Sequence, residues 1–225
     1  MFFFDSTMIV LVPAIIISIF AQIKIKSSFS KYSKVNSANG YTGAKVARML
    51  MDYSGLFDIP VEITPGKLTD HYDPSKRVMR LSKDVYYGTS VASIGVAAHE
   101  TGHALQDKEH YVPLKLRNTI VPVVNFSSNA SWVLFLIGII LSVPYLVDIG
   151  IILFSAVVVF QLITLPVEFN ASSRALKILE SKSILYGDEI NGAKSVLSAA
   201  AMTYVAATLM AISQLIRLVL ISRDR

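Results

Sequence analysis

The sequence predicts a mainly α-helical membrane protein that carries one small α+β domain. The chain has 225 residues, 53% of them hydrophobic and 16% charged, and its mean hydropathy is +0.53. This balance is too apolar for an ordinary soluble domain. The apolar residues lie in four long runs, and the polar residues lie mainly between the first run and the second. We therefore expect four membrane spans and a folded domain after the first of them.

The first span is expected at Met8–Ile23, with residues 2–4 as an apolar extension. About 20 apolar residues are needed to cross the hydrocarbon core. Asp5 precedes the run in place of a Lys or Arg, and no small-x-small cleavage site precedes Lys24. We therefore expect a retained helix and not a signal peptide. Pro13 is expected to kink this helix, which neighbouring helices tolerate.

Positive charge follows the first span directly. Four lysines follow it at once, namely Lys24, Lys26, Lys31 and Lys34. In all, 14 of the 21 basic residues lie between Lys24 and Arg117. Because cytoplasmic segments carry the excess of Lys and Arg, this end is expected in the cytoplasm and the N-terminus outside. The net charge of +5 then reflects topology. We expect membrane lipid as a partner and no nucleic acid.

Residues 36–118 are more polar and predict a small folded domain. Thr42 can cap a helix that runs to about Tyr53 and ends before Gly55. Turn-forming residues then separate segments with strand composition. Strand or extended structure is expected at Pro60–Thr64, Leu68–Tyr72 and Arg77–Ser82.

Three more spans are expected at Ile120–Val143, Ile149–Leu165 and Ala199–Ile221. A tight hairpin is expected at Ser142–Asp148, and Pro166 is expected to end the third span. The first half of the second span carries polar residues that should face protein and not lipid. These residues are Asn125, Ser127, Ser128, Asn129 and Ser131.

Alternation of the spans returns the third one to the cytoplasmic side. Residues 167–197, which are amphipathic with a break at Gly187–Glu189, are therefore expected on the same side as the polar domain. The terminal Arg223–Arg225 would lie outside, mildly against the positive-inside rule. Alternatively, the fourth helix lies partly in the membrane interface, so the side of the tail stays open.

The segment His99–His103 is an H-E-x-x-H motif. Residues four apart on a helix share a face, so both imidazoles can hold one Zn²⁺. Glu100 lies one position on, close enough to reach a water on that metal. Gly88-Thr89-Ser90 and a run of small uncharged residues support a helix here. The chain has no cysteine, so a zinc site must use His and carboxylate ligands.

A catalytic zinc takes three protein ligands and keeps one position open. Asp107, one turn past His103, could supply the third ligand. His110 does not fit the longer H-E-x-x-H-x-x-G-x-x-H motif, because positions 106 and 109 lack its Gly and His. Glu168 is the better candidate, because it follows Pro166 at the cytoplasmic mouth of the third span, where an unpaired carboxylate is costly. A helix-terminal role for Glu168 is the alternative.

The motif together with Glu168–Ala171 resembles the membrane zinc metallopeptidases of the YugP-like, or zinc peptidase 2, group. Other segments resemble that group too, from about Tyr41 to the fourth span: Asp70–Pro74, Arg80–Ser82 and Leu165–Phe169. More distantly, the chain is similar to HtpX-type and CAAX-prenyl membrane proteases, whose E-F-x-A-D motif has an Asp where this chain has Ser172. The resemblance implies a gluzincin-like, membrane-embedded endopeptidase with its site facing the cytoplasm.

The expected reaction is hydrolysis of peptide bonds in membrane-associated proteins or peptides. His99, His103 and Glu168 would hold Zn²⁺, which lowers the pKa of its bound water towards ~7. Glu100 would accept the proton of that water as general base. A further donor should stabilise the oxyanion. The candidates are His71, Tyr72 and Arg174, each of which also fits a plain structural role.

The strand at Arg77–Ser82 is expected to offer an open edge to an extended substrate peptide. The residues concerned are Val78, Met79, Arg80 and Leu81. A purely structural hairpin is the alternative. Recognition at such an edge would be largely main-chain, which suits a protease of low sequence preference.

Other classes of function fit the sequence less well. A non-catalytic membrane scaffold with a structural metal has no use for a general base such as Glu100. A ferritin-like iron site needs paired Glu-x-x-His motifs. A transporter would be expected to show an inverted repeat or an ionisable residue in mid-span. A metal other than zinc, the oligomeric state and the substrate stay open.

The predicted protein is thus a multi-pass cell-membrane protein with a cytoplasmic active site. Its five parts are a span at 1–23, a zincin-like domain at 24–118, a transmembrane hairpin at 119–166, a cytoplasmic helical segment with the third ligand at 167–198, and a C-terminal span and tail at 199–225.

Overall fold

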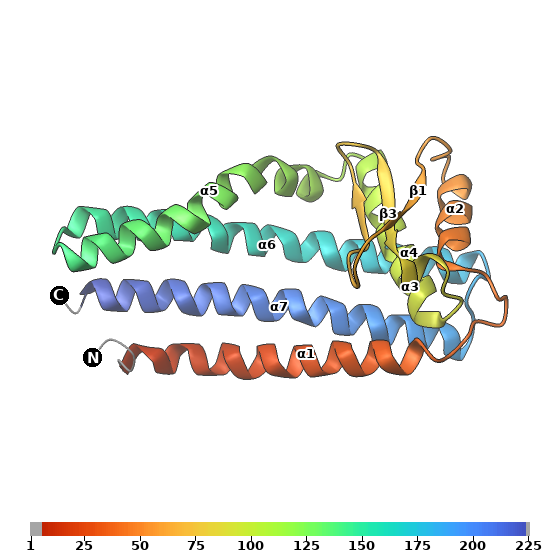
Figure 1. Cartoon of the computed structure of the whole chain (residues 1–225), viewed down its shortest axis with the longest axis horizontal. Helices are drawn as coiled ribbons and strands as arrows, with labels where there is room; N and C mark the ends of the chain where they lie inside the picture. Colours follow the sequence, from red (N-terminus) through yellow and green to blue (C-terminus); the bar gives the residue numbers. More distant parts are fainter. Residues whose placement is uncertain (1–5, 224–225) are drawn as a thin grey trace. The chain divides into compact units, whose positions relative to one another are not determined.

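The computed structural model describes residues 6–223 (Figure 1), so the apolar extension expected at residues 2–4 and the last two residues of the tail, among residues 1–5 and 224–225, lie outside the described part. Helices dominate, and three short strands form one sheet. In chain order the elements are η1 (Ser6–Leu11), α1 (Val12–Tyr32), α2 (Gly43–Tyr53), β1 (Val61–Thr64), β2 (His71–Asp73), β3 (Val78–Ser82), α3 (Lys83–Tyr86), α4 (Val91–Lys108), α5 (Val112–Ile140), α6 (Pro144–Ser181) and α7 (Asp188–Arg223).

The chain forms two compact units. Unit 1 contains the described residues up to Gln22, Lys115–Pro166 and the chain from Met202 onwards. Unit 2 contains Ile23–Leu114 and Val167–Ala201. The H-E-x-x-H motif and Glu168 therefore both belong to unit 2.

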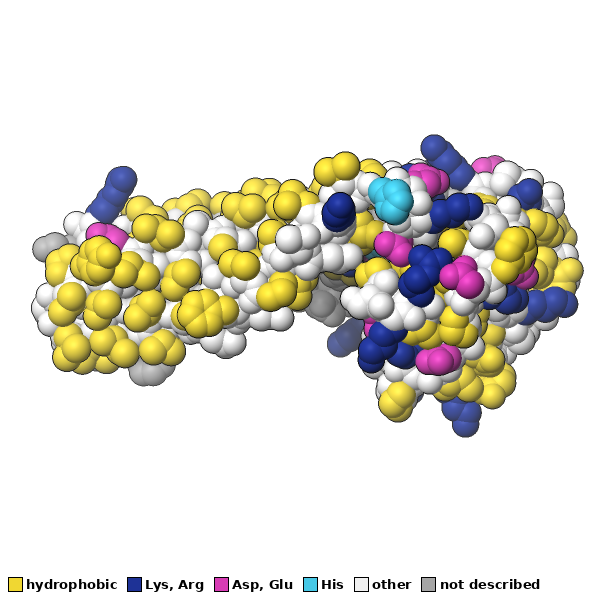
Figure 2. All heavy atoms as spheres, turned by 90° about the horizontal axis from the view of Figure 1, so that it is seen from above, with side chains coloured by type: hydrophobic (Ala, Val, Ile, Leu, Met, Phe, Trp, Pro, Cys, Tyr) yellow, Lys and Arg dark blue, Asp and Glu magenta, His cyan; other side chains and the backbone are white. Residues whose placement is uncertain are grey.

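Within residues 6–223, four helices are long and apolar enough to cross a membrane: Ser6–Tyr32, Val112–Ile140, Pro144–Ser181 and Asp188–Arg223. Figure 2 shows that the visible face of unit 1 is mainly hydrophobic, whereas charged side chains gather over unit 2. Large apolar side chains are exposed along unit 1, among them Ile16, Phe126, Ile140 and Ile152. Exposed apolar surface of this kind needs lipid around it. The predicted class, a mainly α-helical membrane protein with a small α+β part, is confirmed.

Two prolines lie inside the apolar helices. Helix α6 continues through Pro166 to Ser181, so Pro166 does not end the helix that contains the third span. Pro13 lies in the first turn of α1, directly after η1, where a missing N–H costs little. The expected hairpin at Ser142–Asp148 is also shorter than predicted, because α6 already begins at Pro144.

The polar half of the second span is only partly turned towards protein. Ser127 and Ser131 are buried within unit 1, whereas Asn125 and Asn129 are exposed. Asn129 satisfies its amide locally by donating to the carbonyl of Asn125 at 3.1 Å. The prediction therefore holds for one face of α5 and is wrong for the other.

The sheet of unit 2 has the strand order β1-β3-β2. β3 pairs in parallel with β1, with Val61 opposite Met79, and antiparallel with β2, with Tyr72 opposite Met79. The prediction that Val78, Met79, Arg80 and Leu81 form an open edge is therefore wrong. Val78, Met79 and Leu81 are buried because a central strand is covered on its face as well as paired on both sides. The outer strands are β1 and β2.

Helix α4 is the centre of unit 2. Thirteen of its 18 residues are buried, and Ser90 caps its first turn by accepting from the N–H of Ser93 at 3.1 Å. One side of α4 packs with α2 and the sheet in a cluster that includes Met51, Ile59, Met79, Leu81, Ala97 and Ala104. The other side packs with α2, α6 and α7 in a cluster that includes Val46, Leu50, Ile94, Ala98, Leu179 and Leu197. Small residues in α4 permit this close packing on both sides.

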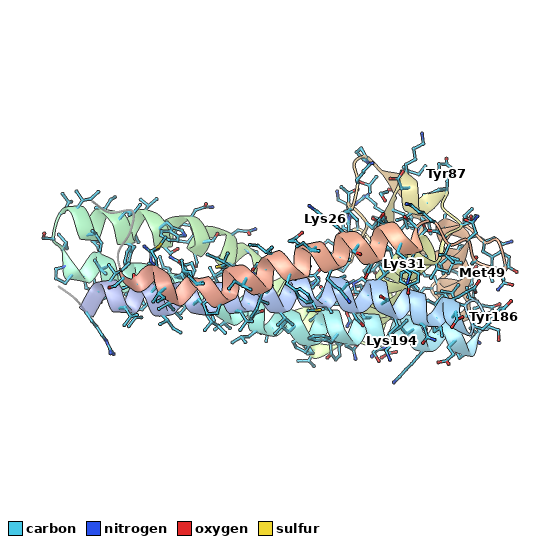
Figure 3. The ribbon with its side chains drawn as sticks, turned by 90° about the horizontal axis from the view of Figure 1, so that it is seen from below. Lys26, Lys31, Met49, Tyr87, Tyr186 and Lys194 are labelled. Carbon is cyan, nitrogen blue, oxygen red and sulfur yellow. The ribbon has the colours of Figure 1, made fainter. Side chains whose placement is uncertain are left out.

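The helix expected from Thr42 to Tyr53 is confirmed as α2. Thr42 accepts from the N–H of Lys45, and Gly55 follows with a φ of +69°, which suits glycine at a helix end. Along α1 and α7, Ser28 and Ser195 lie 3.4 Å apart at their hydroxyls. Figure 3 shows Lys26, Lys31 and Lys194 on these two helices, within unit 2.

Candidate metal centre

The two motif histidines lie on one face of α4, as the spacing predicts. Their ring centroids are 4.8 Å apart and the rings are nearly perpendicular, at 83°. His103 is buried at 8% exposure, and His99 is only slightly more accessible. A buried polar pair of this kind needs partners, because an unsatisfied buried polar group is costly.

Glu168 of α6 supplies the carboxylate that faces both rings. Its Oε2 lies 3.3 Å from Nε2 of His99 and 3.6 Å from Nε2 of His103, and the residue is 3% exposed. The three ligand atoms lie within 4.8 Å of one another. Atoms about 2.1 Å from one tetrahedral zinc lie about 3.4 Å apart. The distances to Oε2 therefore fit zinc, and the ligand set of two histidines and one carboxylate is that of catalytic zinc sites.

Gly102 explains how α6 comes close enough to α4. A Cβ atom at Gly102 would lie 2.5 Å from the carbonyl oxygen of Ala171 and 3.0 Å from its carbonyl carbon. Backbone atoms cannot turn aside as a side chain can. Ala171 lies one turn after Glu168, so a glycine between the motif glutamate and the second histidine sets the approach that brings the third carboxylate to the rings.

Each histidine has a neutral partner at its second ring nitrogen. Nδ1 of His99 lies 3.1 Å from the hydroxyl of Ser172, and Nδ1 of His103 lies 3.0 Å from Oε1 of Gln106. Both Nε2 atoms are thereby directed at Glu168. Ser172 thus contacts a motif histidine through its hydroxyl.

The pKa of His103 is raised above its ordinary value. Burial lowers this pKa, but the hydrogen bond to Glu168 and the charges of Glu100 and Glu168 outweigh burial. Without metal, the proton on His103 is therefore stabilised by the same carboxylate that faces the site. Zinc has to displace this proton, because a histidine ligand binds metal in its neutral form.

Glu100 is held from the side of the sheet. The residue is 8% exposed, and its Oε2 accepts a hydrogen bond from the backbone N–H of Tyr72 at 3.0 Å. Tyr72 is the middle residue of β2, so its N–H points away from β3 and towards α4. The outer side of β2 therefore borders the motif helix at the position of Glu100.

The side chain of Tyr72 anchors β2 to the same helix. Its hydroxyl donates to Oδ2 of Asp107 at 2.8 Å. Burial and this hydrogen bond raise the pKa of Tyr72 well above its ordinary value, so the phenol stays protonated. Arg77 lies 3.8 Å from the same carboxylate and also pairs with Asp58 at 2.9 Å.

The remaining sequence candidates lie elsewhere. Asp107 does not join the histidines, because its carboxylate accepts from Tyr72. Arg174 donates to Oδ1 of Asn170 at 2.7 Å and pairs with Glu109 at 2.7 Å, which leaves its guanidinium committed to those two groups. His71 is exposed on β2, with Nδ1 2.7 Å from the carbonyl oxygen of Thr69.

Sequence reasoning missed two contributors to the site, Gln106 and the backbone N–H of Tyr72. Gln106 is three residues after His103, so the helical period places both on one side of α4. That spacing was available in the sequence as a signal. No sequence pattern indicates the N–H of Tyr72, because it depends on how the sheet packs on the helix.

These features define a class, a multi-span membrane protein in which two histidines of a buried H-E-x-x-H helix and a glutamate of a second helix form a group that could hold a metal. The family described as "Putative neutral zinc metallopeptidase" matches residues 7–223, and the chain belongs to this family. A relative from Bacillus subtilis (strain 168), named "Putative membrane protease YugP", is 56% identical over 210 residues, which are 93% of each chain. No solved structure matches the chain.

The family assignment confirms the resemblance seen in the sequence. It implies Zn²⁺ as the cofactor, and His99, His103 and Glu168 are a group that could bind it. It also implies peptide substrates and a protease activity, and the membrane location agrees with the four apolar helices.

Proposed function

We propose that this protein is a zinc-dependent endopeptidase that cleaves membrane-associated proteins or peptides, with Glu100 as general base. One observation carries the proposal: Glu168 meets both Nε2 atoms of an H-E-x-x-H helix at distances that suit one tetrahedral metal. A purely structural metal would not need the buried carboxylate of Glu100 as a general base beside it.

In this proposal, His99, His103 and Glu168 hold the metal. Zinc in such a site acts as a Lewis acid that activates water and polarises a carbonyl. Glu100 accepts a proton from the attacking water and delivers it to the leaving nitrogen. The N–H of Tyr72 holds Oε2 of Glu100, which leaves Oε1 as the atom that takes the proton.

An extended substrate would lie beside β2, near Glu100, without using the N–H of Tyr72, which already donates to Glu100. This strand replaces the one expected from the sequence, because β3 is paired on both sides. A peptide added to the edge of a sheet is recognised mainly through its backbone. His71 lies on this strand and is exposed, so of the three side chains expected to stabilise an oxyanion it is the one we retain.

We further propose that the site faces the cytoplasm. The support is the positive-inside rule applied to unit 2, which contains all four lysines at the C-terminal end of α1 and just beyond it. Substrates would then be cytoplasmic segments of membrane proteins or peptides held near the bilayer. A cysteine introduced at Lys26 and labelled from one side of intact membrane vesicles tests this orientation.

The first prediction compares two carboxylate variants in the detergent-purified full chain. Glu100→Gln should keep about one zinc and lose cleavage of a casein-type peptide by about 10²- to 10⁴-fold, because it removes the general base. Glu168→Ala should lose zinc, because it removes a ligand. Metal content by atomic absorption and peptide release are the two measurements.

Glu180→Gln is the matched control, because Glu180 is an exposed carboxylate on the same helix as Glu168. It should leave zinc and cleavage unchanged. Wild type that holds zinc but cuts no peptide would favour a scaffold with a structural metal. If Glu168→Ala binds zinc as tightly as wild type, the ligand assignment is wrong.

A further inference from the structure

Gln106 is a fully buried side-chain amide whose hydrogen-bonding groups are all used. It is 0% exposed. Its Oε1 lies 3.0 Å from Nδ1 of His103, and its Nε2 donates to the carbonyl of Val167 at 2.8 Å and to Oδ1 of Asn170 at 3.0 Å. One amide therefore contacts a proposed zinc ligand on α4 and two residues of α6.

The direction of each of these hydrogen bonds is fixed, because the groups around Gln106 include some that can only donate and some that can only accept. A guanidinium only donates, so Nε of Arg174, 2.7 Å from Asn170, requires the oxygen of Asn170 to face it. That same oxygen, like the carbonyl of Val167, can only accept. Nε2 of Gln106 must therefore face both, and its oxygen is left facing His103.

This orientation sets the protonation of the ring. An amide oxygen accepts but does not donate, so Nδ1 of His103 must carry the hydrogen. In neutral His103 the lone pair then lies on Nε2, the nitrogen that faces Glu168. A buried amide thus selects the tautomer that can bind a metal at Nε2.

The same amide also fixes the distance between two ligands. Val167 immediately precedes Glu168, and Asn170 follows it by two residues. Gln106 therefore binds α6 at one residue before Glu168 and one residue after it, while it also contacts the ring of His103. His99 differs, because the hydroxyl of Ser172 can donate or accept and so imposes no tautomer.

We propose that Gln106 is a positioning residue for the metal. It holds His103 in the tautomer that can bind a metal at Nε2, and it fixes the position of that ring relative to Glu168. Asn170 accepts from the amide of Gln106 and from Arg174, which fixes the orientation of the amide. This inference rests on the proposed ligand set. It predicts that zinc affinity depends on the hydrogen bonds of residue 106 and not on its volume.

The test measures zinc affinity by competition with a chromophoric chelator, on the full chain in detergent. Gln106→Leu keeps the approximate volume and removes every hydrogen bond, so zinc should bind about 10- to 100-fold more weakly. Gln106→Glu can still accept from Nδ1 but places an oxygen against the carbonyl of Val167, so its affinity should lie between wild type and Leu. The cobalt absorption spectrum should change shape in Gln106→Leu, because the geometry of the ligands changes.

Thr101→Val is the matched control, because Thr101 is equally buried on α4 and donates only within the helix, to the carbonyl of Ala97 at 2.9 Å. It should leave zinc affinity unchanged. Equal affinity in wild type and Gln106→Leu overturns the inference. Weaker binding in Gln106→Glu than in Gln106→Leu overturns it too, because the variant that keeps an acceptor for Nδ1 of His103 would then bind zinc less well than the variant that lacks one.

Asn170→Ala serves if the Leu variant does not fold, since it removes one acceptor and leaves Gln106 in place. It should weaken zinc binding by a few-fold, and an unchanged affinity contradicts the role given to Asn170 and Gln106. Failure of the wild type to bind zinc at all would be different, because it overturns the proposed ligand set and, with it, this inference.

Discussion

The metal ligands and the proposed general base are held in different ways. His99, His103 and Glu168, the proposed ligands, lie where α4 packs against α6, and Gln106 and Ser172 contact the second nitrogens of the two rings. Glu100 is instead held by one N–H from a strand of three residues at the edge of a small sheet. The difference implies that metal binding and turnover can be separated by mutation, although both depend on α4.

The helix crossing should be the more sensitive of the two. Gly102→Ala places a methyl group 2.5 Å from the carbonyl oxygen of Ala171, so α4 and α6 must separate. We expect zinc affinity to fall by at least about 100-fold, because the ligands on the two helices move apart, and the fold to lose about 1 to 3 kcal/mol from overpacking. Chelator competition and thermal unfolding in detergent measure the two effects.

Gly95→Ala is the control for this substitution, because Gly95 lies on the same helix. A Cβ there would be 3.5 Å from Cβ of Ala193, an ordinary contact. Alanine is also the better helix former, so stability should stay the same or rise by up to about 1 kcal/mol. Equal zinc affinity in both variants would show that the crossing at Gly102 does not position Glu168.

The attachment of β2 should affect turnover without affecting metal. Tyr72→Phe removes the hydroxyl that donates to Asp107 while the ring stays in the core. Loosening the strand should leave the N–H of Tyr72 less well directed at Glu100. We expect cleavage to fall by about 10-fold, the effect of losing one hydrogen bond to a charged group, with zinc affinity unchanged.

Tyr86→Phe provides the comparison, because Tyr86 is a partly buried tyrosine packed against the same core cluster. Its cleavage rate should match that of wild type. A parallel loss of zinc in Tyr72→Phe would mean that the sheet and the metal ligands form one cooperative structure, contrary to the separation argued above.

The same contrast describes what the sequence can predict. The motif helix, the cap at Thr42 and the position of Glu168 beside the two histidines follow from local signals, namely helical spacing, capping residues and a carboxylate that is costly to leave unpaired beside the bilayer. The strand order does not follow, because nothing in the sequence of β3 distinguishes a central strand from an edge strand. The continuation of α6 through Pro166 likewise depends on packing that a single proline does not reveal.

The contribution of Gly102 could not be predicted from the sequence either. A glycine inside a helix normally predicts a weak helix, and only the position of the backbone of Ala171 shows why it is needed. Gln106 lay within reach of sequence reasoning because its spacing from His103 is helical. Its partners on α6 are some 60 residues away and come from the tertiary fold.

The ion pairs of Arg77, which lie at the surface beside the contact between Tyr72 and Asp107, should have the smallest effect on cleavage. Arg77 pairs with Asp58 at 2.9 Å and approaches Asp107 at 3.8 Å, but its side chain is 47% exposed and that of Asp58 is 63% exposed. Exposed ion pairs contribute little, because water and salt screen them. Arg77→Gln should therefore change cleavage by less than about threefold and leave zinc affinity alone.

Glutamine is the appropriate replacement because Arg77 has a φ of +48°. Glutamine bears a similar backbone cost there, whereas glycine or asparagine would relieve strain and confuse the comparison. Cleavage by Arg77→Gln and Tyr72→Phe should be measured at low and high salt. A salt-sensitive loss in Arg77→Gln as large as that in Tyr72→Phe would mean that charge, and not the buried hydroxyl, holds β2 against α4. A small loss of cleavage in Arg77→Gln that does not depend on salt would mean that the hydrogen bond between Tyr72 and Asp107 holds β2 against α4.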